Sequence, residues 1–510
     1  MKKYIDIKRA IIFAFICCIA GSAFAQKIVY SEPERDDTRR INFEVIGKID
    51  GKYLVYKNIR NRNWITGFDD NMTEVFKIEQ GYMPDDRLIN VDFFPYTDFF
   101  YMIYQYQRKN SVYCMAVKIN GEGKRISDVM ELDSSHISVL TSNKIYSVIS
   151  SEDKSKLMVF KINSRNRQKY LITTKLFDDQ SKLLKKSVIL MPMEDRNEYL
   201  DEFYLDNQGD FVFTKFFRQS NDIISRASMI VKYAQADSFF VKELDIEKKY
   251  LDELHVKIDN FNKRYLLTSF YYKERRGNID GFYFFVWDKE TAKQQMENTV
   301  AFSDELRKEA KGESNLKMAF NDYFIRHIII RKDGGFLIGS EAFYTTSRYN
   351  SWNRWDYLYG SPFYSPLDYY YYSPYYNSLW YRSRFSNSQN ARYHADNIVV
   401  LSFDKSGNLQ WNNVINKEQY DDDTDDLISY QLMNTGGQLH FLFNVEERRT
   451  NLLNDYILSG KGEVNHNPTL KNLDKGFEFM AKYGKQVSAY QMIVPCVYRN
   501  NICFAKIDFN

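Results

Sequence analysis

The sequence predicts an all-β protein built from repeated units of four antiparallel strands. Three observations point to this fold class. Aromatic residues make up 16% of the chain, and such side chains favour strands over helices. Short apolar runs alternate with polar turn signals along most of the chain. The same order of turns also recurs at unit-sized intervals, which is the mark of a repeat architecture.

The repeated unit can be read eight times, with seven as the alternative because the copies have diverged. The first strands of the eight units are predicted to begin near Ile41, Leu88, Lys144, Glu198, Leu251, Tyr323, Leu427 and Lys475. The interval after Tyr323 is the longest because it contains a tyrosine-rich insertion, residues 344–394.

Two kinds of turn define each unit. The first and second strands are joined by tight turns such as Asp50-Gly51 and Asp333-Gly334, which are strong hairpin signals because both residues tolerate positive φ. The third and fourth strands are joined by a polar turn that follows Phe68, Phe177 and Phe403, and an aspartate comes next in each case. This agreement in position and chemistry supports the repeat.

The two ends of the chain are predicted to complete one unit together. The last unit stops at Asn510 after its third strand, and residues 27–33 form a spare strand-like piece before the first unit. The economical solution is a closed ring in which this amino-terminal piece supplies the missing outer strand. Such closure removes the exposed edges that an open sheet leaves.

Part of the sixth unit resembles a known repeat family. Residues 333–338 (DGGFLI) and 399–411 (VVLSFDKSGNLQW) are similar to the repeats of secreted bacterial β-propellers, of the type Asp-Gly-Gly-aromatic followed by Leu-Asp-x-x-Gly-x-x-x-Trp. The resemblance is partial in the first and third units. It implies a β-propeller of four-stranded blades and an exported setting, and it implies no particular activity.

The amino terminus has the pattern of a secretory signal peptide. Basic residues precede an apolar run, residues 10–20, and Ala23-Phe24-Ala25 is a small-x-small cleavage site. We therefore expect residues 1–25 to be removed and residues 26–510 to form a single propeller domain in the periplasm or outside the cell. No later run is long enough for a membrane helix.

The charge balance argues against nucleic-acid binding. The whole chain has a net charge of +3, and the signal segment carries all of it, since four basic residues there oppose Asp6 alone. A neutral mature chain lacks the basic excess that displaces counterions from a nucleic acid.

Cys496 and Cys503 are candidates for a disulfide bond. They flank a predicted hairpin centred on Arg499-Asn500, which would place them opposite each other on neighbouring strands. An exported setting permits the bond, and two buried free thiols are the alternative.

Arginine recurs in the predicted turns between second and third strands, which share one face of a propeller. The ligand candidates are Arg60, Arg62, Arg108, Arg165, Arg167, Arg275 and Arg276. Guanidinium groups in this arrangement suit carboxylate, phosphate or sulfate groups. The alternative is that arginine is simply a solvated choice at hairpin tips, often beside acidic residues.

The tyrosine-rich insertion is predicted to emerge on the same face. Its candidate contact residues are Trp352, Trp355, Tyr370, Tyr372 and Trp380. Tyrosine and tryptophan combine a large apolar face with a polar tip, as binding surfaces do. A lid packed over the propeller mouth is the alternative.

These patterns favour a non-enzymatic binding protein. The sequence contains no nucleophile elbow, zinc-protease helix, paired Cys-x-x-Cys or phosphate-binding glycine loop, and it predicts no cofactor and no metal. The expected partner is a protein, or an acidic or glycan macromolecule, of the cell envelope. The alternative function is a carbohydrate-binding or carbohydrate-active propeller that uses the insertion as a sugar platform. The oligomeric state is not predicted.

Overall fold

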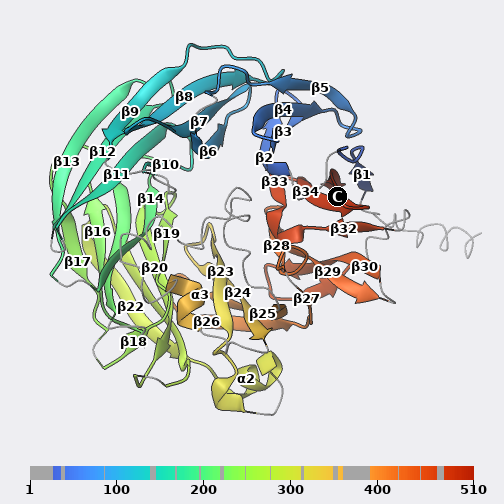
Figure 1. The fold of residues 1–510 in the computed structure, drawn as a ribbon. Coiled ribbons are helices and arrows are strands. Elements are labelled where there is room, and N and C mark those ends of the chain that lie inside the picture. The colour runs from blue at the N-terminus through green and yellow to red at the C-terminus, as the bar shows by residue number, and fades with distance from the viewer. Residues whose placement is uncertain are drawn as a thin grey trace, which may run out of the picture.

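The computed structural model describes residues 27–35, 41–84, 87–137, 145–166, 169–194, 197–218, 223–246, 248–275, 277–311, 315–347, 354–359, 391–422, 424–447, 450–467 and 476–509. The predicted signal peptide lies outside these residues. Within them, β-strands form seven antiparallel sheets that follow one another around a ring (Figure 1). The predicted all-β class, built on four-stranded antiparallel sheets, is confirmed.

Each group of four or five strands is called a unit here, and the units are numbered in chain order. Unit 1 contains β2 (Ile41–Ile49), β3 (Lys52–Ile59), β4 (Arg62–Phe68) and β5 (Glu74–Glu79). Unit 2 contains β6 (Arg87–Pro95), β7 (Phe99–Arg108), β8 (Ser111–Asn120) and β9 (Met130–His136). Unit 3 contains β10 (Ser147–Ser150), β11 (Lys156–Asn166), β12 (Lys169–Asp178) and β13 (Leu183–Pro192).

Units 4 and 5 belong to one sheet. Unit 4 contains β14 (Glu198–Leu205), β15 (Phe211–Arg218), β16 (Ile224–Lys232) and β17 (Phe240–Glu243). Unit 5 contains β19 (His255–Asp259), β20 (Arg264–Tyr272), β21 (Gly281–Asp288) and β22 (Lys293–Ala301). The short strand β18 (Tyr250–Leu251) pairs with both β16 and β20 and so joins the two units.

The remaining strands form three sheets. Unit 6 contains β23 (Tyr323–Ile330), β24 (Phe336–Ser347), β25 (Ala391–Phe403), β26 (Leu409–Ile415) and β27 (Tyr420–Asp422). Unit 7 contains β28 (Gln431–Asn434), β29 (Gln438–Glu447), β30 (Thr450–Ser459) and β31 (Val464–His466). Unit 8 contains β32 (Phe477–Phe479), β33 (Lys485–Ser488), β34 (Gln491–Tyr498), β35 (Asn501–Asp508) and the amino-terminal β1 (Lys27–Tyr30).

The amino-terminal strand pairs with the last strand of the chain. In this antiparallel pair, Lys27 lies opposite Asp508 and Tyr30 lies opposite Ala505. The ladder continues beyond β1, since the backbone N–H groups of Ser31 and Glu34 donate to carbonyl oxygens of β35. The pairing expected from the sequence is therefore present.

Apolar side chains on both faces of the sheets pack between neighbouring units. One core cluster joins Phe43 and Phe68 of unit 1 to Ile493 and Phe504 of unit 8. Another joins unit 1 to unit 2. The inner strands are buried on both faces, and every residue of β20 is buried. Such strands read as continuous apolar runs rather than as alternating patterns.

Corresponding turns of neighbouring units lie at the same end of the ring. In the turn between β2 and β3, the Asp50 N–H donates to the carbonyl oxygen of Thr97, at 2.9 Å. Thr97 lies in the corresponding turn of unit 2. On the other side of unit 1, the Tyr53 hydroxyl donates to Gln491 of unit 8, also at 2.9 Å. First-to-second-strand turns therefore share one end of the ring, called the opposite face here. Second-to-third-strand turns share the other end, called the loop face.

The turn between the third and fourth strands presses on the preceding unit. Gly462 of unit 7 has a φ of +87°, and a Cβ atom on it would come within 2.7 Å of the Trp411 ring in unit 6. A Cβ atom on Gly123 of unit 2 would likewise come within 2.6 Å of the Phe76 ring in unit 1. The glycine and the aromatic residue of the repeat thus meet across the boundary between two units.

A Gly462→Ala variant is expected to lose about 2 to 4 kcal/mol of unfolding free energy. The new methyl group would collide with the indole of Trp411, and alanine is also strained at positive φ. Urea denaturation measures the loss. Gly460→Ala in the same turn is the matched control, because no atom lies within 4 Å of its Cβ position. Equal stability of the two variants would contradict the interpretation.

Helices are short in the described part of the chain. A helix is expected over residues 303–320, and the structure has α2 (Asp304–Lys311) followed by a 3-10 turn, η2 (Leu316–Met318). Ser303 caps α2 as expected, through a 3.2 Å bond from the Leu306 N–H. Asn315, directly before η2, is left-handed, with a φ of 56°, so the expected helix is not continuous through this position. A second 3-10 turn, η3 (Ala481–Tyr483), and the helix α3 (Arg354–Tyr359) complete the set.

Candidate binding face

The described arginine candidates lie on exposed turns of the loop face. Arg60 and Arg62 flank the turn between β3 and β4, and Arg108 ends β7 in unit 2. Arg275 follows β20 in unit 5. All four side chains are exposed, and Arg62 has Glu79 at 3.9 Å as an ion-pair partner. The fold thus brings these residues to one end of the ring, on different units.

The other candidates cannot be placed in the same way. Arg165 belongs to β11, but its side chain lies outside the described part of the structure. Trp355 belongs to α3, and its side chain also lies outside the described part of the structure. The remaining candidates lie outside the described residues altogether: Arg167, Arg276, Trp352, Tyr370, Tyr372 and Trp380.

The tyrosine-rich insertion joins the second and third strands of unit 6, as expected. Its flanks are more regular than the sequence indicates, because Tyr344 pairs with His394 and Ser347 pairs with Ala391. The strands β24 and β25 therefore extend four residues into the stretch assigned to the insertion at each end. These extensions carry the chain onto the loop face.

Helix α3 of the insertion is fixed to units 5 and 6 by Arg354. The guanidinium of Arg354 contacts both carboxylate oxygens of Asp252, with its Nε at 3.1 and 3.2 Å. It also donates to the carbonyl oxygens of Asn321, at 3.1 Å, and Tyr323, at 2.5 Å. The Phe324 ring lies beneath it, with the centroid 3.8 Å from Cζ. The guanidinium therefore uses its planar fork and its flat face together.

This anchor is completely enclosed. The Asp252 side chain has no exposed surface, and the Tyr272 hydroxyl donates to it at 2.7 Å. Burial alone would lower the pKa of Arg354, but the Asp252 charge outweighs this effect and raises the pKa. Arg354 is thus cationic in the core. Leu358 of α3 packs in the same apolar cluster as Phe324 and Phe343.

A second enclosed ion pair lies at the boundary of units 6 and 7. Glu341 of β24 contacts Lys417 at 2.9 Å, and both side chains are almost fully buried. The Ser429 hydroxyl donates to the same carboxylate. Burial alone raises the pKa of Glu341, but Lys417 and Arg326 lower it below the usual range. This carboxylate is therefore an anion whose charge is balanced inside the fold.

A third cluster joins units 4 and 5. His255 lies between Glu202, at 3.5 Å, and Glu253, at 3.3 Å. Burial alone lowers the pKa of His255, but Glu253 and Glu202 raise it to about 10. The imidazole is therefore protonated at neutral pH and acts as a fixed cation. A permanently protonated imidazole does not serve as a general base.

Two of the charged residues in these clusters, Glu202 and Arg326, occupy a position of the repeat where other units have an apolar residue. The first strand of several units has a β-bulge, which falls at Ile46 in unit 1 and Ile89 in unit 2, both buried. The same irregularity falls at Glu202 in unit 4 and Arg326 in unit 6. Units 4 and 6 therefore depart from the repeat at this position. Sequence reasoning missed this cluster, although Asp252-Glu253 at the start of a predicted inner strand is an available signal.

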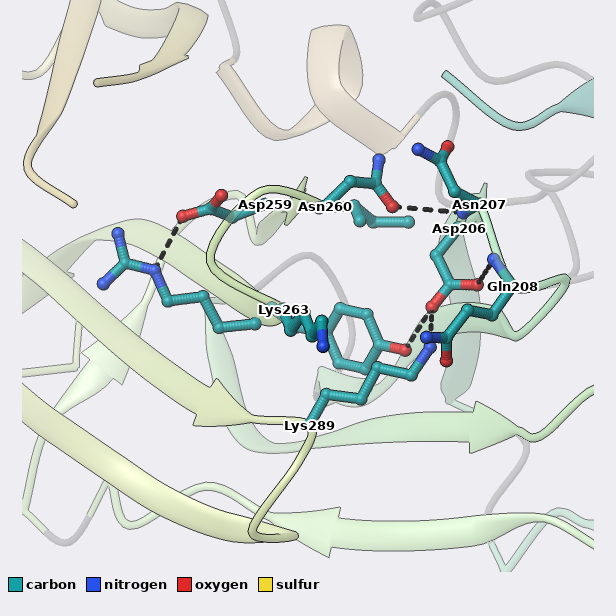
Figure 2. A pocket seen from close by; sticks show the side chains of 10 residues that line it. Asp206, Asn207, Gln208, Asp259, Asn260, Lys263 and Lys289 are labelled. Carbon is teal, nitrogen blue, oxygen red and sulfur yellow. Dashed lines mark hydrogen bonds and ion pairs between the residues drawn. The ribbon is translucent and has the colours of Figure 1, made fainter. Parts of the chain in front are cut away.

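A small pocket lies on the opposite face, between units 4 and 5 (Figure 2). Asp206 lies at its centre and contacts Lys289 and the Tyr265 hydroxyl. Lys289 also contacts Asp210 at 2.7 Å. Asn207 and Asn260 from adjacent turns complete the rim (Figure 2). Because the charges of Asp206, Asp210 and Lys289 are paired with one another across the boundary between units 4 and 5, the pocket is best explained as a structural contact between the two units.

Cys496 and Cys503 lie opposite each other on β34 and β35, as expected. The turn between them has positive φ at Arg499 and Asn500, which is the geometry of a tight hairpin. Both cysteines are buried free thiols with their sulfur atoms 2.9 Å apart. The structure therefore has the expected juxtaposition without the bond.

The described residues contain no group of three or more His, Cys, Asp or Glu side chains that could hold a metal ion. Among the same residues, no helix is long and apolar enough to cross a membrane.

Comparisons with known proteins give distant structural similarity only. No family model matches the sequence, and no curated protein matches it. The chain is similar to dipeptidyl peptidase 4 of Porphyromonas gingivalis at 9% identity and a TM-score of 0.44, over 94% of this chain and 59% of that one. It is similar to the polysaccharide lyase Uly1 at 9% identity and a TM-score of 0.40, over 95% and 99%.

A third similar structure is prolyl oligopeptidase B of Galerina marginata, at 8% identity and a TM-score of 0.40, over 93% of this chain and 56% of that one. The chain thus spans little more than half the length of the two peptidases. At this identity the similarity gives no indication of activity.

Proposed function

We propose that the chain is a closed propeller of eight blades that binds a macromolecular partner through its loop face. The eight units, the pairing of β1 with β35 and the core shared by units 8 and 1 support the blade count and the closure. The repeat residues Asp333-Gly334 and Trp411 support the relation to secreted bacterial propellers.

One observation carries the binding role. The insertion is held at the loop face by Arg354, whose charge is enclosed with Asp252 in the core. Burying an ion pair costs free energy unless its geometry is excellent. A loop with no binding role does not need such a buried pair to hold it in place. Helix α3 of the insertion is thereby held at the same end of the fold as the turns that carry the exposed Arg60, Arg62 and Arg275.

The proposed setting is the periplasm or the exterior of the cell. The basic, apolar and small-residue pattern of residues 1–25 supports export, and the neutral charge of the remaining chain argues for a partner other than a nucleic acid. The charged clusters of units 4 to 6 are paired internally, which supports binding over catalysis.

Photo-crosslinking by face tests this function. A photoreactive amino acid at Asn61 or Glu446, both exposed on the loop face, is expected to give discrete crosslinked species in a cell-envelope preparation. The control position is Phe261 on the opposite face, whose side chain is 76% exposed. Crosslinks from Phe261 alone, or from neither face, would rule the proposal out.

A further inference from the structure

Exposed basic residues lie on the loop face of three consecutive units. Units 8, 1 and 2 pack side by side through shared apolar cores. Five basic residues lie at their second-to-third-strand turns and are called the cationic arc here: Arg60, Arg62, Arg108, Lys109 and Arg499. All five are exposed, and none of the three turns contains a carboxylate.

Carboxylates lie beside the basic residues in two other turns of this face. In unit 5, Glu274 lies next to Arg275, and in unit 7 the turn follows Glu446. Within the described residues, these two turns therefore carry both signs of charge, whereas the turns of units 8, 1 and 2 carry basic residues only.

The three turns of the arc share a strained backbone. Each has a basic residue followed by asparagine, and the basic residue has positive φ: 51° at Arg60, 51° at Lys109 and 49° at Arg499. Glycine, asparagine and aspartate are the residues that accept this conformation readily. The chain places arginine or lysine there three times, at a cost of about 1–2 kcal/mol each. Tight hairpins also hold the charges in fixed positions.

Aromatic side chains lie beside the basic groups. The Arg108 guanidinium lies 5.8 Å from the Tyr106 ring centroid, and Tyr106 stacks on Tyr113 at 5.2 Å. Arg499 lies 5.2 Å from the Tyr498 ring. In unit 1, the half-buried Trp64 of β4 has the Lys77 ammonium group 5.8 Å from its ring centroid. The tips of units 2 and 8 thus combine a charged group of the arc with part of an aromatic face.

We propose that the cationic arc binds an anionic polysaccharide whose sugar units carry carboxylate or sulfate groups. Guanidinium groups match planar or trigonal oxyanions by paired hydrogen bonds, and tyrosine or tryptophan supplies an apolar face for a sugar ring. Three similar tips on neighbouring units suit a polymer with repeated charges, because linked contacts strengthen one another. The inference rests on the proposed function and names the partner class of the same face.

The test uses the full chain and defined polymers. Polygalacturonate carries carboxylates, dextran sulfate carries sulfates, and unmodified dextran is the neutral control. Binding to at least one anionic polymer is expected, weakened by added salt, with no binding to dextran. Tighter binding to single-stranded oligo-dT than to both polysaccharides would assign the arc to nucleic acid and overturn the proposal.

The decisive variant is Arg60→Asn/Lys109→Asn/Arg499→Asn. Asparagine accepts positive φ, so the three hairpins are expected to keep their fold while losing their charge. Polysaccharide affinity is expected to fall at least about tenfold, since a single charge-assisted contact has that effect. The matched control is Lys154→Asn/Lys263→Asn, which removes lysines of positive φ from turns of the opposite face. Equal loss in both variants would overturn the proposal.

The two proposals fail separately. Crosslinking from Asn61 and Glu446 reports any partner of the loop face. If these crosslinks form but neither anionic polymer binds, the polysaccharide inference is wrong and the loop-face function stands. If polymer binding is unchanged in the arc variant, the anionic chain binds elsewhere and the inference is equally wrong.

Discussion

An Arg354→Met variant is expected to lose about 3 to 5 kcal/mol of unfolding free energy. Methionine fills much of the same volume, but it leaves the Asp252 carboxylate enclosed without its cation. It also removes donors from the carbonyl oxygens of Asn321 and Tyr323. Urea denaturation gives the total loss. Hydrogen exchange of residues 354–359 is expected to accelerate, because the polar contacts of Arg354 join α3 to units 5 and 6.

The double variant Arg354→Met/Asp252→Asn separates charge from packing. Without the Asp252 charge that Arg354 balances, it is expected to be more stable than Arg354→Met alone, and the amide oxygen that replaces the Asp252 carboxylate can still accept from the Tyr272 hydroxyl. If the double variant is as unstable as the sum of the two single variants, the pair has no electrostatic coupling. That result would leave α3 held by the packing of Leu358 and by the hydrogen bond from Arg326 to the Tyr357 hydroxyl.

A Glu34→Gln variant is expected to lose about 3 kcal/mol of unfolding free energy. Glu34 follows the amino-terminal strand and contacts Lys57 of β3 and, at 3.0 Å, Lys77 of β5. The Lys57 side chain is only 1% exposed, so removal of its counter-charge leaves a buried ammonium group. The contact ties the strand of unit 8 to the sheet of unit 1. Glu32→Gln, at an exposed position of the same segment, is the control.

The stabilisation by Glu34 has a defined pH dependence. Burial alone raises the pKa of Glu34, but Lys57 and Lys77 outweigh it and lower the pKa below the usual 4.5. A lowered pKa in the folded state gives stability that is complete above the unfolded pKa and is lost as pH falls through the folded one. The stability gap between the native chain and Glu34→Gln is therefore expected to be constant near neutrality. A gap that does not shrink below about pH 4.5 would contradict this assignment.

Much of the fold is predictable because its signals are local. The aspartates of the third-to-fourth-strand turns are an example, since Asp69 and Asp404 accept backbone N–H groups two and four residues further on. Such a turn needs no distant partner, so the sequence alone specifies it. The strands that begin at Ile41, Glu198 and Tyr323 start where the sequence predicts them.

The candidate site is less predictable because its contacts are distant. Arg354 and Asp252 are separated by 102 residues, and nothing in either stretch of sequence identifies the other residue as its partner. Helix α3 has only six residues in a tyrosine-rich segment, too few for a helical period to appear. The arc is intermediate, since its basic residues are visible in the sequence, but the side-by-side packing of units 8, 1 and 2 depends on apolar contacts between them.

The union of β1 with β35 also sets an order for folding. Phe504 and Ser31 are joined by a hydrogen bond although they lie 473 residues apart along the chain. The last sheet therefore cannot be completed until the carboxyl-terminal strand has been synthesised and has met the amino-terminal one. Contacts of such long sequence separation form slowly. Until the two strands pair, the backbone groups at the outer edge of β35 have no strand partner. The incompletely folded chain is therefore most prone to aggregation at that edge.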